Sequence, residues 1–312
     1  MRIVINTKLN KLITFFILLL SLIILLAYFK NQQKVTSNQY KFDGEKALSG
    51  VEYQLNLGSR ITGSSARAEV INWIVEELNT NNWEAEINSS ENNGILIKNI
   101  VGKKGNGKPW IIIGAHYDSR MYADQDKEPS NRNLPVPGAN DGASGVAILL
   151  ELSRLIDNDF MQKSWAKEIW LVFFDAEDNG NIPGWDWIMG SDSFAENLQE
   201  TPNLVVVLDM VGDADLNIFM ESNSNRMYTE EIWRAAADLG YDNYFIPEIK
   251  YNIIDDHIPF IRKGIPAIDI IDFDYPYWHT TEDTLDKVSA ESMTIVGNTL
   301  ISWLTNSQHP QE

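Results

Sequence analysis

The sequence predicts an α/β protein with a single three-layer domain, in which a central, mostly parallel mixed sheet carries helices on both faces and one transmembrane helix precedes it. Segments with strand character alternate with segments of helical periodicity along most of the chain, as in proteins with parallel sheets. The segment 168–174 (E-I-W-L-V-F-F) is apolar after its first residue, as expected for a strand buried on both faces. An uncharged apolar run at 12–29 comes before all of these elements.

The individual elements follow from the spacing of the apolar residues. Helices are expected where apolar residues recur every three or four positions, and strands where they alternate or form short runs. These rules predict helices at 47–57, 66–78, 146–156, 230–239 and 289–304, and strands at 83–88, 95–101, 110–113, 168–174, 203–208, 216–221 and 266–271. The segment 102–109, with its glycines and lysines, is expected to form a hairpin turn. No internal repeat and no second domain are expected.

The apolar run at 12–29 is long enough for a membrane span, which needs roughly 17–25 residues. No small-x-small cleavage site follows it, so an uncleaved signal anchor is favoured over a cleavable signal peptide. Three positive residues precede the run and two follow soon after, which favours a cytoplasmic N-terminus at 1–11. The polar stretch 30–44 is interpreted as a tether, the domain at 45–305 as extracytoplasmic and membrane-anchored, and 306–312 as a tail.

The composition excludes several functional classes. The 312 residues include 44 Asp and Glu but only 25 Lys and Arg, for a formal net charge of −19. A chain this acidic is not expected to bind nucleic acid, because neutralising phosphates requires clustered cations. The chain contains no Cys, which excludes disulfides and thiolate chemistry. Most of the acidic residues are expected on the solvated surface, and some of them as metal ligands.

Residues that bind metals follow three of the expected strands. In α/β proteins, sites form at the carboxyl ends of such strands. The strands at 110–113, 168–174 and 203–208 are followed by His116 and Asp118, by Glu177 and Asp178, and by Asp209, while Asp141 stands before the helix at 146–156 and His279 lies near the C-terminus. Imidazoles and carboxylates together form a ligand set for zinc.

Each of these features alone has an ordinary structural explanation. An H-x-D pair after a strand is more often structural than metal-binding, an Asp before a helix usually caps it, and an adjacent Glu-Asp pair is usually solvated charge. However, carboxylates gathered at one edge of a sheet repel one another and would not all stay ionised without a cation. We therefore interpret the set as a metal site.

Five segments carry a resemblance to a known family. They are G-A-H-Y-D-S (114–119), G-A-N-D-G-A-S-G (138–145), F-F-D-A-E-D (173–178), L-D-M-V-G (208–212) and W-H-T (278–280). In this order they resemble the family of zinc aminopeptidases and glutaminyl-peptide cyclotransferases, which covers about residues 45–305. The resemblance implies a zinc exopeptidase-like fold, a zinc-dependent catalytic domain and peptide or protein N-termini as substrates.

The resemblance also implies a set of zinc ligands. In the two-metal members of the family, the residues matching His116 and Asp209 bind one zinc, those matching Asp178 and His279 bind the other, and Asp141 stands where a carboxylate bridges them. The chain departs from the family at Asp178, where a Glu is common, and the Asp side chain is one methylene group shorter. One or two zinc ions are expected.

Two reactions are expected from such a site, both with Glu177 as the general acid/base. In the aminopeptidase branch, Glu177 would activate a water molecule that hydrolyses the first peptide bond. In the cyclotransferase branch, it would pass a proton from the α-amine of an N-terminal Gln to the departing ammonia, which leaves pyroglutamate. Asp118 would orient His116, as carboxylates commonly orient ligating imidazoles.

Residues outside the ligand set favour the cyclotransferase branch modestly. Trp278 directly precedes the ligand His, as in the cyclotransferases, where it walls the substrate pocket. Asp255 matches an acid that hydrogen-bonds to the position of Asp209, which places both among the catalytic residues. Trp185 and Trp187 lie near a further pocket tryptophan of these relatives, although core packing explains a single Trp equally well.

One residue opposes this assignment, and one further class of function stays open. The cyclotransferases commonly have a His where this chain has Asp269. Some proteins of this fold have also lost their ligands and serve as binding ectodomains. Because all five ligand positions and Glu177 are occupied by competent residues, a non-catalytic binding domain is the remote alternative.

Overall fold

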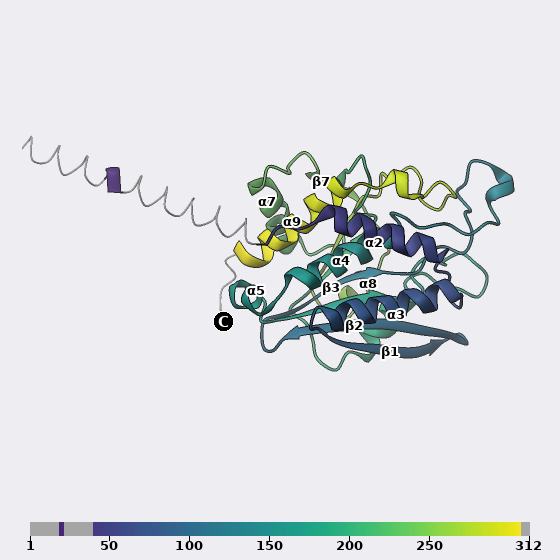
Figure 1. The fold of residues 1–312 in the computed structure, drawn as a ribbon, viewed down its shortest axis with the longest axis horizontal. Coiled ribbons are helices and arrows are strands. Elements are labelled where there is room, and N and C mark those ends of the chain that lie inside the picture. Colours follow the sequence, from purple (N-terminus) through teal and green to yellow (C-terminus); the bar gives the residue numbers. More distant parts are fainter. Residues whose placement is uncertain (1–18, 22–39, 307–312) are drawn as a thin grey trace, which may run out of the picture. The chain divides into compact units, whose positions relative to one another are not determined.

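In the computed structural model, which describes residues 19–21 and 40–306, a six-stranded sheet organises the chain from Phe42 onward (Figure 1). From one edge to the other its strands are β1 (Glu84–Asn92), β2 (Ile95–Gly105), β4 (Glu168–Phe174), β3 (Trp110–His116), β5 (Leu204–Asp209) and β8 (Ala267–Ile271). The last four run parallel to one another, whereas β2 is antiparallel to both β1 and β4. The predicted single α/β domain with a mixed sheet is therefore confirmed.

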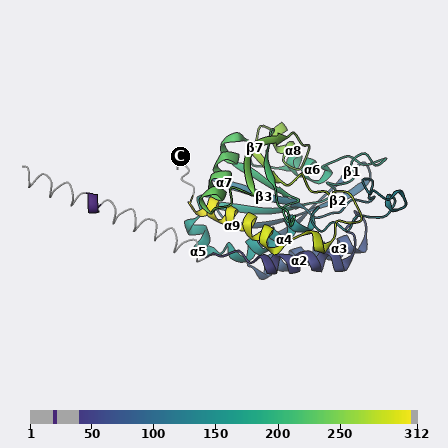
Figure 2. The same cartoon turned by 90° about the horizontal axis from the view of Figure 1, so that it is seen from above.

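Helices cover both faces of the sheet because its inner strands are apolar on both sides. Every residue of β3 and β5 is buried. One face carries α2 (Gly44–Leu57), α3 (Ser65–Thr80), α4 (Ala143–Leu155) and α9 (Ala290–Asn306), and the other carries α6 (Met189–Asn197) and α8 (Ile258–Arg262) (Figure 2). On the second face, Phe174 of the sheet packs against Phe194 of α6 and Phe260 of α8.

Smaller elements complete the domain. A two-stranded parallel sheet of β6 (Ile218–Glu221) and β7 (Phe245–Tyr251) lies next to β8, with α7 (Arg226–Asp238) packed on β7. The helix α5 (Asn158–Lys163) and the 3-10 turns η1 (Pro129–Asn131) and η2 (Leu285–Lys287) lie in the connections. The predicted strand at 216–221 thus belongs to a separate small sheet, and its mostly exposed partner β7 was not predicted.

The segment 102–109 does not form the predicted hairpin. β2 continues to Gly105 and pairs with β4, and β4 lies between β2 and β3. The turn residues after Gly105 signal a change of direction, but they carry no information about which strand becomes the neighbour. The hairpin prediction was therefore wrong about the pairing.

The folded unit begins inside the stretch 30–44 that was predicted as a tether. Phe42 is 1% exposed and packs directly against Gly297 of α9. The side chain of Asp43 accepts a hydrogen bond from the Lys46 amide and caps α2. Such a cap satisfies an amide that has no partner within the helix, so α2 starts three residues before the predicted helix.

No helix within residues 19–21 and 40–306 is both long enough and apolar enough to cross a membrane. The predicted anchor at 12–29 lies outside the described residues except at 19–21. The anchor therefore stays a prediction.

Candidate metal centre

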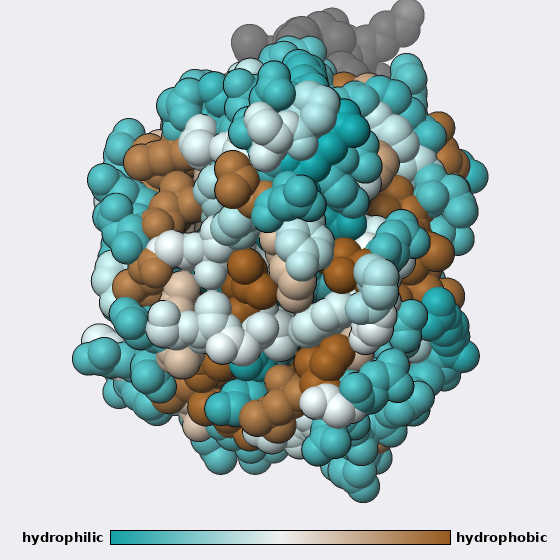
Figure 3. Space-filling model, turned by 90° about the vertical axis from the view of Figure 1, so that its right-hand side faces the viewer, coloured by the Kyte–Doolittle hydropathy of each residue, from teal (hydrophilic) through white to brown (hydrophobic). Residues whose placement is uncertain are grey.

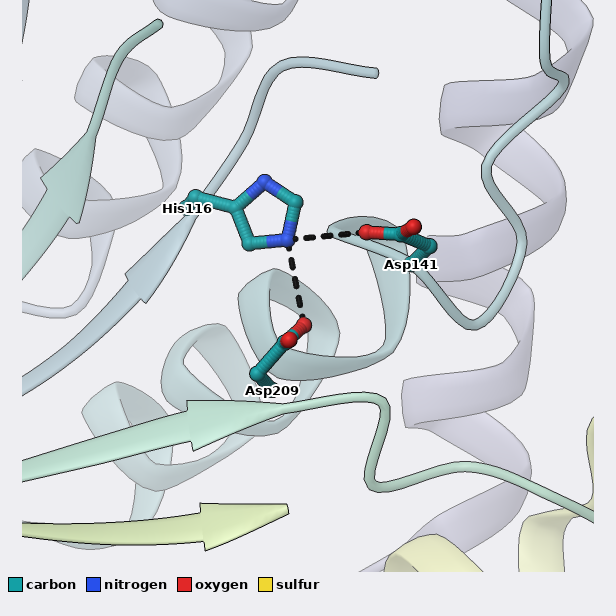
Figure 4. A group of neighbouring side chains, drawn as sticks. All are labelled: His116, Asp141 and Asp209. Carbon is teal, nitrogen blue, oxygen red and sulfur yellow. Dashed lines mark hydrogen bonds and ion pairs between the residues drawn. The ribbon is translucent and has the colours of Figure 1, made fainter. Parts of the chain in front are cut away.

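The side chains singled out from the sequence meet at the carboxyl ends of the parallel strands. His116 is the last residue of β3, Asp209 is the last residue of β5, and Asp141 lies two residues before α4. Nε2 of His116 lies 3.1 Å from Oδ1 of Asp141 and 3.1 Å from Oδ1 of Asp209 (Figure 4). These atoms form one group that could hold a metal ion.

A second group shares Asp141 with the first. Nε2 of His279 lies 2.7 Å from Oδ1 of Asp178 and 3.8 Å from Oδ2 of Asp141. Asp141 thus faces His116 with one oxygen and His279 with the other, which is the arrangement of a bridging carboxylate. The five predicted ligands are therefore brought together as two groups with one common member.

The donor atoms of the second group fit zinc. The side chains of Asp141, Asp178 and His279 are at most 4% exposed. Oδ2 of Asp141 and Oδ2 of Asp178 have no hydrogen-bond partner among the described residues. Because buried polar atoms are nearly always satisfied, such atoms point to an ion or a water that completes the site. A set of carboxylate and imidazole donors is one that zinc prefers.

The pKa values in the centre show how strongly the carboxylates need a counter-charge. Burial disfavours a charged imidazole at His116, but Asp118, Asp141 and Asp209 outweigh it and hold the pKa of His116 well above its usual value. Burial, together with the charge of Asp255, raises the pKa of Asp209 to about 7. A proton and a metal cation are alternative counter-charges here, so metal binding would release protons.

Left-handed backbone turns place the ligands after the strands. Ala176, Met210 and His279 have φ values of 53°, 47° and 56°, a region that residues other than glycine rarely adopt. Each lies at a ligand or next to a catalytic candidate, where such local strain is commonly found. Gly142, with φ of 89°, brings the chain so close to His116 that a Cβ would lie 3.1 Å from Cε1 of its ring and 2.6 Å from the Asp118 carbonyl oxygen.

Asp118 contacts both sides of the centre. Its carboxylate accepts hydrogen bonds from the amides of Glu177 at 3.1 Å and Asp178 at 3.3 Å. One of its oxygens also lies 3.5 Å from Nδ1 of His116. This single buried side chain therefore positions the end of β3 and the segment after β4 relative to each other.

A second supporting carboxylate, Asp124, was not identified from the sequence. Its Oδ1 lies 3.5 Å from Nδ1 of His279, so it faces this ligand as Asp118 faces His116. Arg120 holds Asp124 through two hydrogen bonds of 3.0 and 2.6 Å and donates to the backbone carbonyls of Asp178 and Gly180. The i, i+4 spacing of Arg120 and Asp124 was the available signal.

Glu177 lies within the centre but in neither ligand group. It is 7% exposed. Burial, together with the charges of Asp178, Asp255 and Asp256, raises the pKa of Glu177 well above its usual value. A carboxyl group with a raised pKa can both give and take a proton near neutral pH, which is what a general acid/base requires.

The three predicted tryptophans occupy different places. The rings of Trp278 and Trp187 both stack on His279, with ring centroids 3.6 and 5.9 Å from the imidazole. Trp187 lies so close to Gly180 that a Cβ there would meet the indole at 2.0 Å. Trp185 instead packs against the apolar cluster that contains Ala176. Core packing was the alternative to a pocket position for this tryptophan.

Two further supports come from distant parts of the chain. The carboxylate of Asp283 accepts hydrogen bonds from the amides of Asn140 and Asp141 and from the Tyr275 hydroxyl. The fully buried Arg60 donates to backbone carbonyls of the loop at 117–138. Neither residue had a local sequence signal, because the site segments that each supports lie more than 50 residues away along the chain.

The surface around the centre is mixed in polarity. Figure 3 shows the side of the molecule that carries the long loop between β3 and α4, where hydrophobic patches lie between hydrophilic residues. Tyr122 and Leu134 of this loop are 39% and 49% exposed. A cavity of about 940 Å³ lies elsewhere, at the start of β3 and β4 near Trp110 and Trp170, and none of the candidate site residues lines it.

Comparisons with known proteins agree with this geometry. A family model described as "Peptidase family M28" matches residues 96–304. The curated glutaminyl-peptide cyclotransferase of Boiga dendrophila is 30% identical over 226 residues, which cover 60% of this chain and 59% of that protein. The chain thus spans less than two thirds of that relative's length.

Two solved structures are similar over most of the chain. The glutaminyl cyclase of Tannerella forsythia is 33% identical, with a TM-score of 0.78, and the match covers 86% of this chain and 100% of that one. A Zn-dependent exopeptidase from Parabacteroides distasonis is 30% identical, with a TM-score of 0.78, and the match covers 86% and 99%. The predicted zinc exopeptidase-like fold is therefore confirmed.

Proposed function

We propose that this chain, which belongs to peptidase family M28, is a zinc-dependent glutaminyl-peptide cyclotransferase that converts N-terminal Gln into pyroglutamate with release of ammonia. The observation that carries the proposal is the pair of tryptophans, Trp187 and Trp278, stacked on His279 beside the buried Glu177. Aromatic walls suit a reaction in which a small amide reacts without water. The relatives named as cyclotransferases and glutaminyl cyclases support the same assignment.

In this proposal the five ligands would hold one or two zinc ions, with Asp141 between the two groups. Bound zinc would supply a Lewis acid for the side-chain carbonyl of the substrate. Asp118 and Asp124 would keep His116 and His279 in the orientation that binding requires. The indole rings would exclude water from the amide, which strengthens electrostatic interactions in the pocket.

Glu177 would move the one proton that the reaction transfers. The α-amine of the substrate forms a new bond to the carbonyl carbon of its own Gln side chain, and the bond from that carbon to the amide nitrogen breaks. Glu177 accepts a proton from the α-amine and returns it to the departing nitrogen, which leaves as ammonia. Burial and the charge of Asp255 raise the pKa of Glu177, so the ionised Glu177 would be a stronger base than an exposed carboxylate. The same two causes raise the pKa of Asp209 to about 7, and Asp209 and Asp255 would be the other catalytic acids beside Glu177.

Mass analysis of reaction products tests the proposal. Incubated with the purified chain, a Gln-led peptide is expected to lose the mass of ammonia while its first peptide bond stays intact. Blocking the α-amine is expected to abolish the reaction, since that nitrogen is the nucleophile. The proposal fails if a Leu-led peptide is shortened by one residue and the Gln-led peptide never loses ammonia.

The aminopeptidase is a second candidate, favoured by the position of Asp141. Its two oxygens face the two ligand groups separately, and two metal ions side by side are a known arrangement for hydrolysis. The Zn-dependent exopeptidase from Parabacteroides distasonis has the same fold. A non-catalytic binding domain is the remaining alternative. It would be supported if both the Gln-led and the Leu-led peptide stay unchanged in the presence of zinc.

We also propose that residues 12–29 anchor the chain in a membrane, with the catalytic domain on the extracytoplasmic side. The support is the uncharged apolar run and the charges on either side of it. Substrates would then be the N-termini of peptides or proteins outside the cytoplasm.

A further inference from the structure

A third group of buried ionisable side chains contains none of the five ligands of the centre described above, although it includes the proposed catalytic residue Asp255. Asp255 and His257 directly precede α8, and Asp269 lies in β8. A ring nitrogen of His257 and one carboxylate oxygen from each Asp lie within 4.8 Å of one another. All three residues are at most 3% exposed. The segment before α8 and the strand β8 thus bring three buried polar side chains together.

His257 is oriented by a further carboxylate. Its Nε2 lies 3.3 Å from Oε2 of Glu221, and its Nδ1 lies 3.8 Å from Oδ2 of Asp269. Glu221 is held rigidly, because its carboxylate accepts hydrogen bonds from the backbone amides of Asn223, Ser224 and Ile253. A fixed anion beside Nε2 favours the tautomer with hydrogen on Nε2, which leaves the lone pair of Nδ1 facing the Asp269 side.

The same pattern occurs in the candidate metal centre. There, Nδ1 of His116 faces the supporting carboxylate of Asp118, and Nε2 faces the ligand group. Ligating histidines typically have one nitrogen on the metal and the other beside a carboxylate or carbonyl. His257 repeats this arrangement with its two nitrogens exchanged.

The polar atoms of this third group lack partners. Oδ2 of Asp255, both carboxylate oxygens of Asp269 and Nδ1 of His257 have no hydrogen-bond partner among the described residues. The main centre shows the same feature at Asp141 and Asp178. Leaving a buried carboxylate without a hydrogen bond or a cation is costly, so either a bound cation or shared protons must neutralise the group.

We propose that Asp255, His257 and Asp269 bind a divalent cation of the zinc type, separate from the main centre, with Glu221 orienting His257. Two aspartates and a neutral imidazole balance the charge of a divalent ion and provide three ligands. At bond lengths of about 2.0–2.2 Å, tetrahedral ligand atoms lie roughly 3.4 Å apart. The 3.8 Å between Nδ1 and Oδ2 of Asp269 therefore needs only a small inward rotation.

The number of zinc ions per chain tests this site. The full chain would be stripped with a chelator, refilled with a small excess of zinc and analysed for metal, as wild type and as Asp269→Asn, His257→Gln and Asp256→Asn. We expect the first two variants to hold one zinc ion fewer per chain than the wild type. Asp256→Asn is the matched control, since Asp256 is a neighbouring buried acid outside the group, and it is expected to keep the wild-type number.

A measurement on the wild type decides the question even if the variants fail to fold. Crystals grown with stoichiometric zinc are expected to give an anomalous peak between Asp255, His257 and Asp269. The proposal is overturned if the main centre shows such a peak and this group does not, or if folded Asp269→Asn holds as much zinc as the wild type. In either case shared protons, and not a metal, would neutralise the group.

Discussion

Replacing Asp118 by Asn tests how the main centre is held together. The carboxylate of Asp118 accepts amide hydrogen bonds from Glu177 and Asp178 and faces Nδ1 of His116. Asn keeps the shape of the side chain, but it has one acceptor oxygen where Asp has two. Since the site is fully buried, water cannot replace the missing acceptor, and one backbone amide would face an NH₂ group.

The magnitude follows from these contacts. A buried donor without a partner costs about 1–3 kcal/mol, so the free energy of unfolding of Asp118→Asn is expected to fall by about that amount. Loss of the anion beside His116 and displacement of Asp178 weaken two ligands. Removing such a supporting residue typically lowers metal affinity or activity by about 10–100-fold, and we expect zinc affinity to fall by that factor.

The assay is a zinc competition titration against a chromogenic chelator, together with thermal unfolding of the zinc-free chain. Asp213→Asn is the control, because Asp213 is also a buried acid that accepts a backbone amide, from Asp215, but belongs to no ligand group. Because Asn keeps the one acceptor oxygen that the Asp215 amide needs, the control is expected to keep both its stability and its zinc affinity. If Asp118→Asn binds zinc as tightly as the wild type, the carboxylate does not position the ligands and the reasoning is refuted.

Four further predictions follow from other parts of the chain. Glu177→Gln is expected to keep its zinc and lose about 10²–10⁴-fold in turnover; loss of metal would make Glu177 a ligand instead. Arg67→Met leaves Asp175 as a buried unpaired acid, so chemical denaturation should show a loss of about 3–5 kcal/mol, and an unchanged midpoint would contradict this. Burial raises the pKa of Asp272 from 3.8 to about 7, so the wild type should lose stability relative to Asp272→Asn as the pH rises from about 4 to about 7. If the difference in unfolding free energy between the two proteins does not change with pH, this prediction is wrong. Protease added to intact cells should release an acidic fragment if 12–29 is an anchor. If the domain is fully protected from the protease, the predicted extracytoplasmic orientation is wrong.

Much of the candidate centre was predictable because its ligands follow strands that could be recognised locally. The strand at 168–174 was predicted with its observed bounds, and β3 and β5 were predicted within three residues at each end. Parallel strands of one sheet bring their carboxyl ends to one edge. Residues that follow such strands therefore converge even when more than 90 positions separate them, as His116 and Asp209 show.

The supports of the centre could not be predicted in the same way. Arg60 bonds to carbonyl groups 77 and 78 positions further along the chain, and Asp283 bonds to the amide of Asp141 across 142 positions. Such contacts depend on how loops pack, which periodicity does not describe. The order of β2, β4 and β3 was missed for the same reason, since neighbouring strands in sequence are not always neighbours in the sheet.

Three buried arginines show how the centre keeps its negative charge available for a cation. Arg60 bonds only to backbone carbonyls through its guanidinium, Arg67 pairs with Asp175, and Arg120 pairs with Asp124. Of these three, Arg120 also contacts a proposed ligand, because its Nη1 lies 3.8 Å from Oδ1 of Asp178. The arginines therefore brace the loops and supporting acids and, apart from this contact at Asp178, make no side-chain ion pair with the ligand carboxylates within the described residues. A centre arranged in this way attracts a metal ion more strongly than one whose ligands were already paired with side-chain cations.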